Sequence, residues 1–280
     1  MSTEKSFPIR QFETNSKEDR DDLVAIEEPL EIRISFMRES KRVMQQVSIT
    51  MRTPGNDTEL AAGFLYTEGI LTAPEQINEI NVSGVDGQGN PTNNIVRVNV
   101  GDDVSLDPQR LRRNFISNSS CGVCGKSSLD SLEVKQITKL DPASPTVPAS
   151  IIYGLPRSLR ETQTVFEKTG GIHAAGIADI DGAMLEISED IGRHNAVDKL
   201  IGGLFQKGEL PASNKIIVVS GRASFEIVQK AIVAGIPMMV AVGAPSSLAV
   251  ELATKYKMTL VGFTSNSRFN VYSVPDRLVD

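Results

Sequence analysis

Several residue types that carry much of protein chemistry are scarce in this sequence of 280 residues, which has no tryptophan, two cysteines, two histidines and four tyrosines. Both cysteines belong to one CGVC motif at residues 121–124, so cysteine does not serve as small apolar filler spread through a core. The histidines, His173 and His194, lie in the segments GGIHAA and EDIGRHN. Thiol and imidazole chemistry is therefore confined to three short segments.

The sequence also lacks an excess of positive charge. It has 29 Lys and Arg against 35 Asp and Glu, which gives a net charge of −6 and a pI near 5.2. This balance argues against a general nucleic-acid binder, whose affinity depends on basic surface, but it allows a small anionic ligand at a local site. The apolar content of 40% is ordinary for a soluble globular protein.

Long hydrophobic segments are absent as well. Residues 1–22 are polar and charged, with no apolar stretch of a secretory signal, so we predict a disordered leader and a cytoplasmic protein with reduced thiols. The longest uncharged run, residues 231–250, is broken by two glycines and two prolines. We therefore expect a buried strand between two helices there, and no membrane span.

The pattern of apolar residues predicts an α/β protein. Residues 23–112 are expected to form a small β-rich α+β domain, residues 113–150 a CxxC loop and linker, and residues 151–280 a sheet flanked by helices. Strands are predicted at 30–37, 43–51, 95–100, 172–180, 183–188, 215–220, 237–242 and 258–263. Helices are predicted at 57–68 (capped by Asp57), 156–168, 193–205, 223–234 and 246–256, with turns over 81–94.

The CxxC motif is flanked by glycine and serine, a setting typical of a reactive or ligating pair on a mobile loop. A free cysteine titrates near about 8.5, and Lys126 together with loop amides would favour the thiolate. Four alternatives are less consistent with the sequence: a buried structural pair, a zinc site with both histidines, a thioredoxin-like pair and a phosphate loop. The histidine spacing is not that of a zinc finger, no strand feeds the motif, and Ser120 replaces the first glycine of the phosphate loop.

Three predicted strand-to-helix junctions contain a glycine or a basic residue: EDIGRHN at 189–195, VVSGRAS at 218–224 and GAPSS at 243–247. Helix N-termini present unpaired amides, and Arg193, His194 and Arg222 would add donors for an anion. A phosphate or nucleotide pocket at one end of the sheet is one interpretation, and plain capping by Asp190 on a solvated face is the other.

Two further residues leave two interpretations open. His173 lies in an apolar strand, where it is either a core histidine or a functional one. Phe263 follows the last predicted strand, where its ring would stack on a planar base or pack into the core; Thr264 and Ser265 would bond a polar edge of the ligand.

Six sequence blocks, taken in order, closely resemble the FdhD/NarQ family over residues 121–272. They are SSCGVCGK, TGGIHAAG, EDIGRHNAVDKLIG, VVSGRASFEIVQKA, GAPSSLAVELA, and LVGF followed by SRFNVY. The resemblance implies a C-terminal cytidine-deaminase-like domain. Deaminases of that fold hold zinc on H-x-E and P-C-x-x-C motifs at two helix starts. Here His194-Asn195-Ala196 and residues 221–224 lack the glutamate and both thiolates, so deamination is not expected.

The family consists of sulfur carriers needed for active formate dehydrogenase. The resemblance implies that a cysteine desulfurase loads a persulfide onto Cys121, with Cys124 assisting. The sulfur would pass to the molybdenum or tungsten of a bis-molybdopterin guanine dinucleotide before its insertion into formate dehydrogenase. It also implies a homodimer. The residues themselves require no metal ion bound by protein side chains. The resemblance carries cofactor binding to Leu260, Val261, Gly262, Phe263, Thr264 and Ser265.

One position departs from the family pattern: Ser265-Asn266 stands where a more basic turn containing glycine is expected, which weakens the case for phosphate contacts there. Two other functions stay open from the sequence. One is a zinc-dependent deaminase or hydrolase. The other is a chaperone that shelters the molybdenum cofactor without transferring sulfur.

Overall fold

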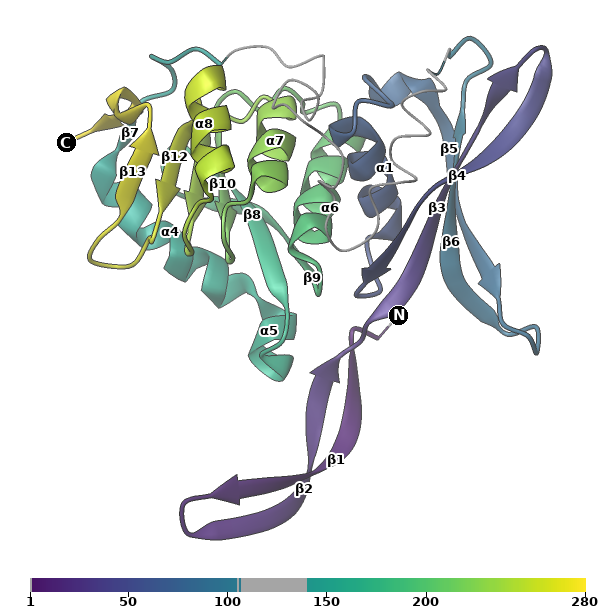
Figure 1. Ribbon diagram of the computed structural model, residues 1–280, viewed down its shortest axis with the longest axis horizontal. Coiled ribbons are helices and arrows are strands. Elements are labelled where there is room, and N and C mark those ends of the chain that lie inside the picture. Colours follow the sequence, from purple (N-terminus) through teal and green to yellow (C-terminus); the bar gives the residue numbers. More distant parts are fainter. Residues whose placement is uncertain (1, 105, 107–139) are drawn as a thin grey trace.

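The structure is a computed structural model that describes residues 2–104, 106 and 140–280 (Figure 1). The predicted reactive pair Cys121 and Cys124, and Lys126 beside it, lie outside the described residues. Two lobes lie side by side, each built on its own sheet, with helices α1 and α6 between them (Figure 1). None of the described helices has the length and apolar character needed to cross a membrane.

The N-terminal lobe is a four-stranded sheet of order β4-β3-β6-β5. Its strands are β3 (Glu28–Arg38), β4 (Lys41–Arg52), β5 (Ile77–Val85) and β6 (Pro91–Val100). Helix α1 (Asp57–Thr67) and the 3-10 turn η1 (Pro74–Gln76) connect β4 to β5. Strands β3 and β6 are parallel, whereas the other two pairs are antiparallel. Leu30, Ile32 and Ile34 alternate along β3 and are fully buried, because they share the sheet face that packs on α1.

The C-terminal lobe is a six-stranded mixed sheet of order β13-β12-β11-β10-β8-β9. Only β10, β11 and β12 run parallel, and the remaining neighbours are antiparallel. Its strands are β8 (His173–Asp179), β9 (Met184–Asp190), β10 (Lys215–Val219), β11 (Met238–Ala241), β12 (Thr259–Gly262) and β13 (Asn270–Ser273). Its helices are α4 (Ala149–Thr162), α5 (Thr164–Thr169), α6 (Arg193–Gln206), α7 (Phe225–Val233) and α8 (Ser247–Tyr256).

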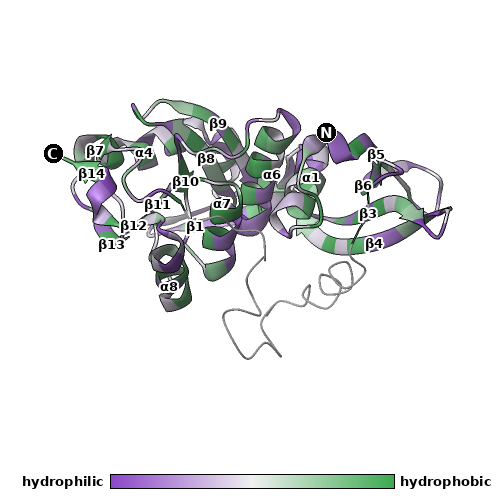
Figure 2. Cartoon of the chain, turned by 90° about the horizontal axis from the view of Figure 1, so that it is seen from above, coloured by the Kyte–Doolittle hydropathy of each residue, from purple (hydrophilic) through white to green (hydrophobic). Residues whose placement is uncertain are grey.

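The alternation of side chains along these strands produces one hydrophobic core on each sheet face. Ile217, Val219 and Leu260 belong to the core under α6, α7 and α8, whereas Val218 and Val261 belong to the core under α4. Figure 2 shows hydrophobic residues concentrated in these strands and the helices that cover them. Strand β7 (Val147–Pro148), just before α4, pairs in parallel with β14 (Leu278–Val279) at the C-terminus. The 3-10 turn η2 (Pro275–Arg277) immediately precedes β14.

Several sequence predictions need correction. The predicted disordered leader, residues 1–22, instead contributes to a hairpin of β1 (Glu4–Glu13) and β2 (Ser16–Ala25), which projects from the body (Figure 1). Its strands carry many charged residues and belong to neither core sheet. The large apolar side chains that they do carry, such as Phe7 and Phe12, are exposed, so no buried face marks them in the sequence. Strand β5 occupies part of the predicted turn region for a similar reason, since most of its residues are exposed or half-buried.

Two helix predictions also differ in detail. The helix expected at 156–168 is two helices, α4 and α5, and Pro156 lies inside α4 and does not begin it. Asp57 does not cap α1. It is the first residue of the helix, and its buried carboxylate accepts Arg52 Nε at 2.9 Å and Arg52 Nη2 at 3.0 Å. The bidentate ion pair therefore uses the carboxylate that capping would need.

Candidate functional site

The loops that follow β10, β11 and β12 lie against one another at the carboxyl edge of the parallel strands. Gly243 N donates to Gly221 O at 3.0 Å, and Phe263 N donates to Gly243 O at 3.1 Å. A β-carbon on Gly243 would lie 3.0 Å from Gly221 O, so this close approach favours glycine. The structure thus confirms that these sequence junctions meet at one end of the sheet.

Phe263 is the exposed aromatic side chain of this edge. Its side chain is 46% exposed, and its backbone has φ 52°, a left-handed conformation that costs a non-glycine residue about 1–2 kcal/mol. The next residue holds this turn in place: Thr264 N and Oγ1 both donate to Ala241 O, at 3.2 Å and 2.9 Å. The alternative of core packing by Phe263 is therefore wrong.

The other predicted cofactor-binding residues are less accessible. Leu260 and Val261 are fully buried in β12, and Thr264 is buried in its clasp on Ala241. Gly262 is buried beside Pro245 and Tyr272. Ser265 is half-buried, and its Oγ donates to Arg268 O at 3.2 Å. Of the six, Phe263 is the exposed one, so the segment presents one ring on a rigid support.

The two histidines of the chain lie at the same edge although they belong to different elements. His173 begins β8, and a β-carbon on Gly221 would lie 3.5 Å from His173 Nδ1. His194 lies in the first turn of α6, with its Nε2 3.3 Å from Ser224 Oγ and 3.9 Å from Glu226 Oε2. The edge therefore gathers imidazole, hydroxyl and carboxylate groups from α6, β8 and α7.

Both imidazoles are neutral near pH 7. Burial lowers the pKa of His194 to about 4, and the positive charges of Lys230 and Arg193 contribute, against the opposing effect of Glu226. Burial and the Arg193 guanidinium likewise lower the pKa of His173. Neutral imidazoles at this edge supply hydrogen bonds and add no positive charge.

Residues of the EDIGRHN segment divide into two groups. The Glu189 carboxylate accepts the amides of Val165 and Phe166, both at 2.9 Å, and so caps α5. Asp190 Oδ1 accepts Gly192 N at 2.8 Å, ahead of the first helical residue, and no side chain caps α6 at Gly192. Asp190 is also fully buried, so the interpretation of plain capping on a solvated face is wrong. Arg193 is different: its Nε is buried and has no hydrogen-bond partner among the residues that the structure describes. Arg193, His194 and the exposed Arg222 therefore remain as the candidate ligand-binding groups of the junctions.

The zinc site considered from the sequence includes Cys121 and Cys124, which lie outside the described residues. Within residues 2–104, 106 and 140–280, no group of three or more His, Cys, Asp or Glu side chains is arranged to hold a metal ion. The helix-start histidine faces Ser224, a hydroxyl, where a zinc site would need a thiolate.

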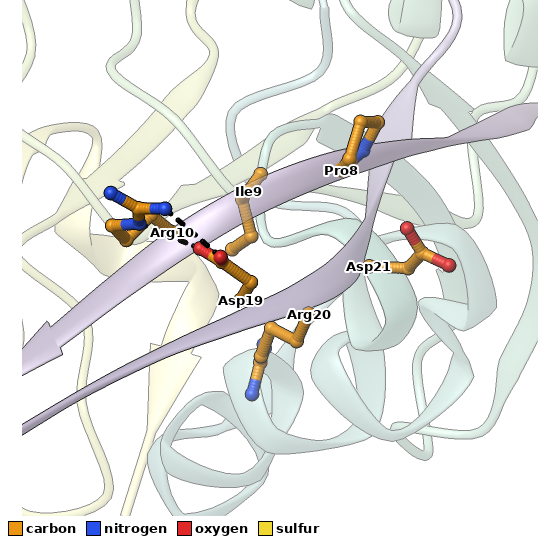
Figure 3. Close-up of a pocket in the computed structure, with 6 residues that line it drawn as sticks. All are labelled: Pro8, Ile9, Arg10, Asp19, Arg20 and Asp21. Atoms are coloured by element: carbon orange, nitrogen blue, oxygen red, sulfur yellow. Dashed lines mark hydrogen bonds and ion pairs between the residues drawn. The ribbon is translucent and has the colours of Figure 1, made fainter.

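A hollow of about 650 Å³ lies on the β1–β2 hairpin and is formed by hairpin residues alone (Figure 3). It contains the exposed ion pair between Arg10 Nε and Asp19 Oδ1 at 2.6 Å. Its lining has no nucleophile and no residue of the sheet edge. The lining residues are Pro8, Ile9, Arg10, Asp19, Arg20 and Asp21. The junction edge, and not this hollow, is therefore the candidate site.

Comparisons with known proteins agree with the sequence motifs. The FdhD/NarQ family model matches residues 25–279. A Streptomyces coelicolor protein named sulfur carrier protein FdhD is 45% identical over 261 residues, covering 92% of this chain and 90% of its own length. A Sulfurisphaera tokodaii protein of the same name is 41% identical over 276 residues and 98% of each chain.

A solved structure has the same overall architecture. A crystal structure from Desulfotalea psychrophila, described as a candidate formate dehydrogenase accessory protein, superposes with a TM-score of 0.74 at 24% identity. The match covers 99% of this chain and 100% of that one. At this level of identity the likeness concerns the fold, and it extends over both lobes and the hairpin.

Proposed function

The chain belongs to the FdhD/NarQ family, and from this membership we propose that it is a sulfur carrier needed for formate dehydrogenase activity. In this proposal a cysteine desulfurase donates sulfur to Cys121. The acceptor is the molybdenum or tungsten of a bis-molybdopterin guanine dinucleotide, which is the substrate of the transfer. Formate dehydrogenase then receives the sulfurated cofactor. The proposal rests on relatives named sulfur carriers that match over nine tenths of the chain.

The chemistry begins with a thiolate. The Cys121 thiolate attacks the outer sulfur of the desulfurase persulfide, a new S–S bond forms on Cys121, and the desulfurase cysteine leaves as a thiolate. Lys126 favours the thiolate electrostatically, and Cys124 assists the later release of sulfur. A cytoplasmic location would keep both thiols reduced between cycles. A homodimer completes the proposal.

The observation that supports the acceptor half of the proposal is Phe263. A partly exposed aromatic ring held at positive φ is a costly arrangement, and such strain is common at ligand sites. A ring of this kind stacks on a planar base, here the guanine of the cofactor. Arg193 and Arg222 lie on the junctions of the same edge and would face the phosphates.

We further propose that the six-stranded lobe has the arrangement of a cytidine deaminase. Support comes from His194 and Ser224, which stand at two successive helix starts and lie 3.3 Å apart. In a zinc deaminase a histidine and cysteines at such helix starts bind the metal. Replacement of a thiolate by a hydroxyl would leave a pocket suited to a nucleotide without the deamination chemistry.

The decisive experiment is the intact mass of the protein after incubation with a cysteine desulfurase and cysteine. We expect the wild type and the Cys124→Ala variant to gain the mass of about one sulfur atom, and the Cys121→Ala variant to gain none. The gain should disappear on treatment with a thiol reductant. An equal gain in Cys121→Ala and wild type would show that the sulfur is carried elsewhere and would overturn the assignment to Cys121.

The chaperone alternative makes the opposite prediction in cells. A protein that only shelters the cofactor would support formate dehydrogenase activity with Cys121→Ala, whereas a sulfur carrier would not. The zinc alternative is tested by metal analysis of the purified protein, where about one zinc per chain would favour it.

A further inference from the structure

A network of buried polar groups ties the first turn of α6 to the end of β4 in the other lobe. Its members on the C-terminal side are Asp190, Asn195 and Lys199, which are 0%, 8% and 3% exposed. We call these three residues the polar clamp. Buried charges are costly unless they are paired and hydrogen-bonded, so their arrangement needs an explanation.

The ionic part of the polar clamp is centred on Thr53. Lys199 Nζ lies 2.7 Å from Asp190 Oδ2 and donates to Thr53 O at 2.8 Å. Thr53 N donates to Asp190 Oδ2 at 3.2 Å, and Ile191 N donates to Thr53 Oγ1 at 3.2 Å. Thr53 thus bonds through its amide, carbonyl and hydroxyl groups, all to residues on either side of the β9–α6 turn.

The amide part of the polar clamp is centred on Asn195. Its Nδ2 donates to Met51 O at 2.8 Å and to Asp190 Oδ1 at 3.1 Å. Its Oδ1 accepts Thr50 Oγ1 at 3.2 Å. Both amide protons and the amide oxygen are therefore used, which fixes the orientation of the side chain.

Arg193 and His194 lie between the anchored residues Asp190 and Asn195. A replacement of a buried ion pair by apolar groups often leaves stability unchanged or improves it, so stability alone does not account for the polar clamp. Its directional bonds instead specify one position for this turn.

We propose that Asp190, Asn195 and Lys199 are positioning residues that hold Arg193 and His194 in register with Phe263 for the diphosphate of a guanine nucleotide. This inference rests on the proposed function and deepens it. The N-terminal lobe then takes part in ligand binding through the end of β4, without touching the ligand.

Thr53→Val tests the proposal, because it removes the hydroxyl that accepts Ile191 N while keeping the shape of the side chain. The probes are guanosine diphosphate and guanosine, each titrated calorimetrically into the full chain. We expect Thr53→Val to lower the affinity for guanosine diphosphate by ~tenfold, a typical loss for one buried hydrogen bond. The affinity for guanosine should be unchanged. Thr53→Ser, which keeps the hydroxyl, should restore the diphosphate affinity.

A control is available at a second buried polar cluster, formed between α1, α6 and α7. There Thr67 Oγ1 donates to Asp198 Oδ1 at 2.8 Å, and Lys230 Nζ lies 2.9 Å from Asp198 Oδ1, again with all three residues buried. Thr67→Val removes the buried hydrogen bonds that the Thr67 hydroxyl forms with Asp198 and Lys230, neither of which belongs to the polar clamp. It should leave both affinities unchanged.

A double-variant cycle with Arg193→Ala separates positioning from general destabilisation. If Thr53 acts through Arg193, Thr53→Val should cost little further diphosphate affinity once Arg193 is replaced. Additive losses, an equal effect of Thr67→Val, or a parallel loss of guanosine affinity would each overturn the proposal. Should Thr53→Val fail to fold, Thr50→Val tests the same network through Asn195.

The outcome for the polar clamp is distinguishable from that for the proposed function. Failure of the wild type to bind guanosine diphosphate would overturn the positioning role and leave sulfur loading of Cys121 to be judged by its mass. Loss of sulfur loading with intact nucleotide binding would overturn the sulfur-carrier role of Cys121 and leave the positioning role standing.

Discussion

Gly63 of α1 and Gly202 of α6 lie against each other where the two helices cross, and neither position has room for a side chain. A β-carbon on Gly63 would lie 1.9 Å from Asp198 O, and one on Gly202 would lie 1.9 Å from Glu59 O. The two lobes therefore meet backbone to backbone along these helices. Such close packing restricts how the two lobes are placed relative to each other. Two residues of the polar clamp, Asn195 and Lys199, belong to the same helix α6.

Gly202→Ala should destabilise the protein by about 2–3 kcal/mol, because the added methyl group forces the two helix backbones apart. Its neighbour supplies the control. A β-carbon on Gly203 would have Glu186 Oε2 as its nearest atom at 3.6 Å, an ordinary contact. Gly203→Ala should therefore stabilise the helix by about 0.5–1 kcal/mol. Denaturant unfolding compares the two, and equal midpoints would contradict the tight crossing.

Phe263→Gly should keep the fold and lose the ligand contact. Glycine adopts φ 52° without steric cost, so the stability should stay the same or rise by about 1 kcal/mol despite the lost ring. Affinity for guanosine diphosphate should fall by about tenfold, the expected loss of one stacking contact. Phe263→Ala provides the comparison, since it loses the ring and keeps the strained backbone. Unchanged nucleotide affinity in both variants would remove Phe263 from the site.

Stability should decrease as the pH falls from 6.5 towards 4, in part because of His194. The unfolded chain binds a proton on this residue below about 6.5, whereas in the folded state burial lowers the pKa of His194 to about 4. The contribution is therefore fully present above pH 6.5 and is lost on acidification through this window. For a fully buried imidazole this contribution to the free energy of unfolding would be about 3 kcal/mol. Because 38% of the His194 side chain is exposed and solvent screens it, we expect ~1 kcal/mol.

His194→Gln checks that prediction through the free energy of unfolding measured at a series of pH values. The variant should lose part of the decline between pH 6.5 and 4. His173 contributes to the rest of the decline in stability because burial also lowers its pKa. The matched comparison is therefore His173→Gln. Identical pH profiles for His194→Gln and the wild type would contradict a lowered pKa of His194 in the folded state.

Deletion of residues 2–22 should change the unfolding temperature by no more than about 2–4 °C. The hairpin forms its own two-stranded sheet and contacts α5, with Lys168 Nζ 2.7 Å from Glu4 Oε1. An exposed pair of this kind contributes about 0–1 kcal/mol. Calorimetry of the truncated and full chains measures the difference, with Lys168→Gln as the variant that removes the ion pair alone. A much larger drop would show that the hairpin supports the core.

The limits of sequence reasoning are clear at the edge of the six-stranded sheet. The junctions after β9, β10 and β11 are predictable because a strand followed by glycine and a new helix has a local signature. The polar clamp was not predicted, because Asn195 bonds to Met51, 144 positions earlier in the chain. A sequence pattern records no contact across such a separation. The sequence alone therefore does not distinguish the residues that anchor this turn, such as Asn195, from its candidate ligand-binding residues Arg193 and His194.

The sequence by itself determined most helices and strands of the C-terminal lobe, the neighbouring junctions and the family, since periodicity and motif order are properties of local segments. It failed for the polar hairpin and for β5, whose side chains pack on little and so carry no hydrophobic pattern. Tertiary structure alone decided that Leu260 and Val261 are buried while Phe263 is exposed. It also decided that both histidines are neutral neighbours, because burial and charge at a site depend on chain segments that meet only in the folded protein.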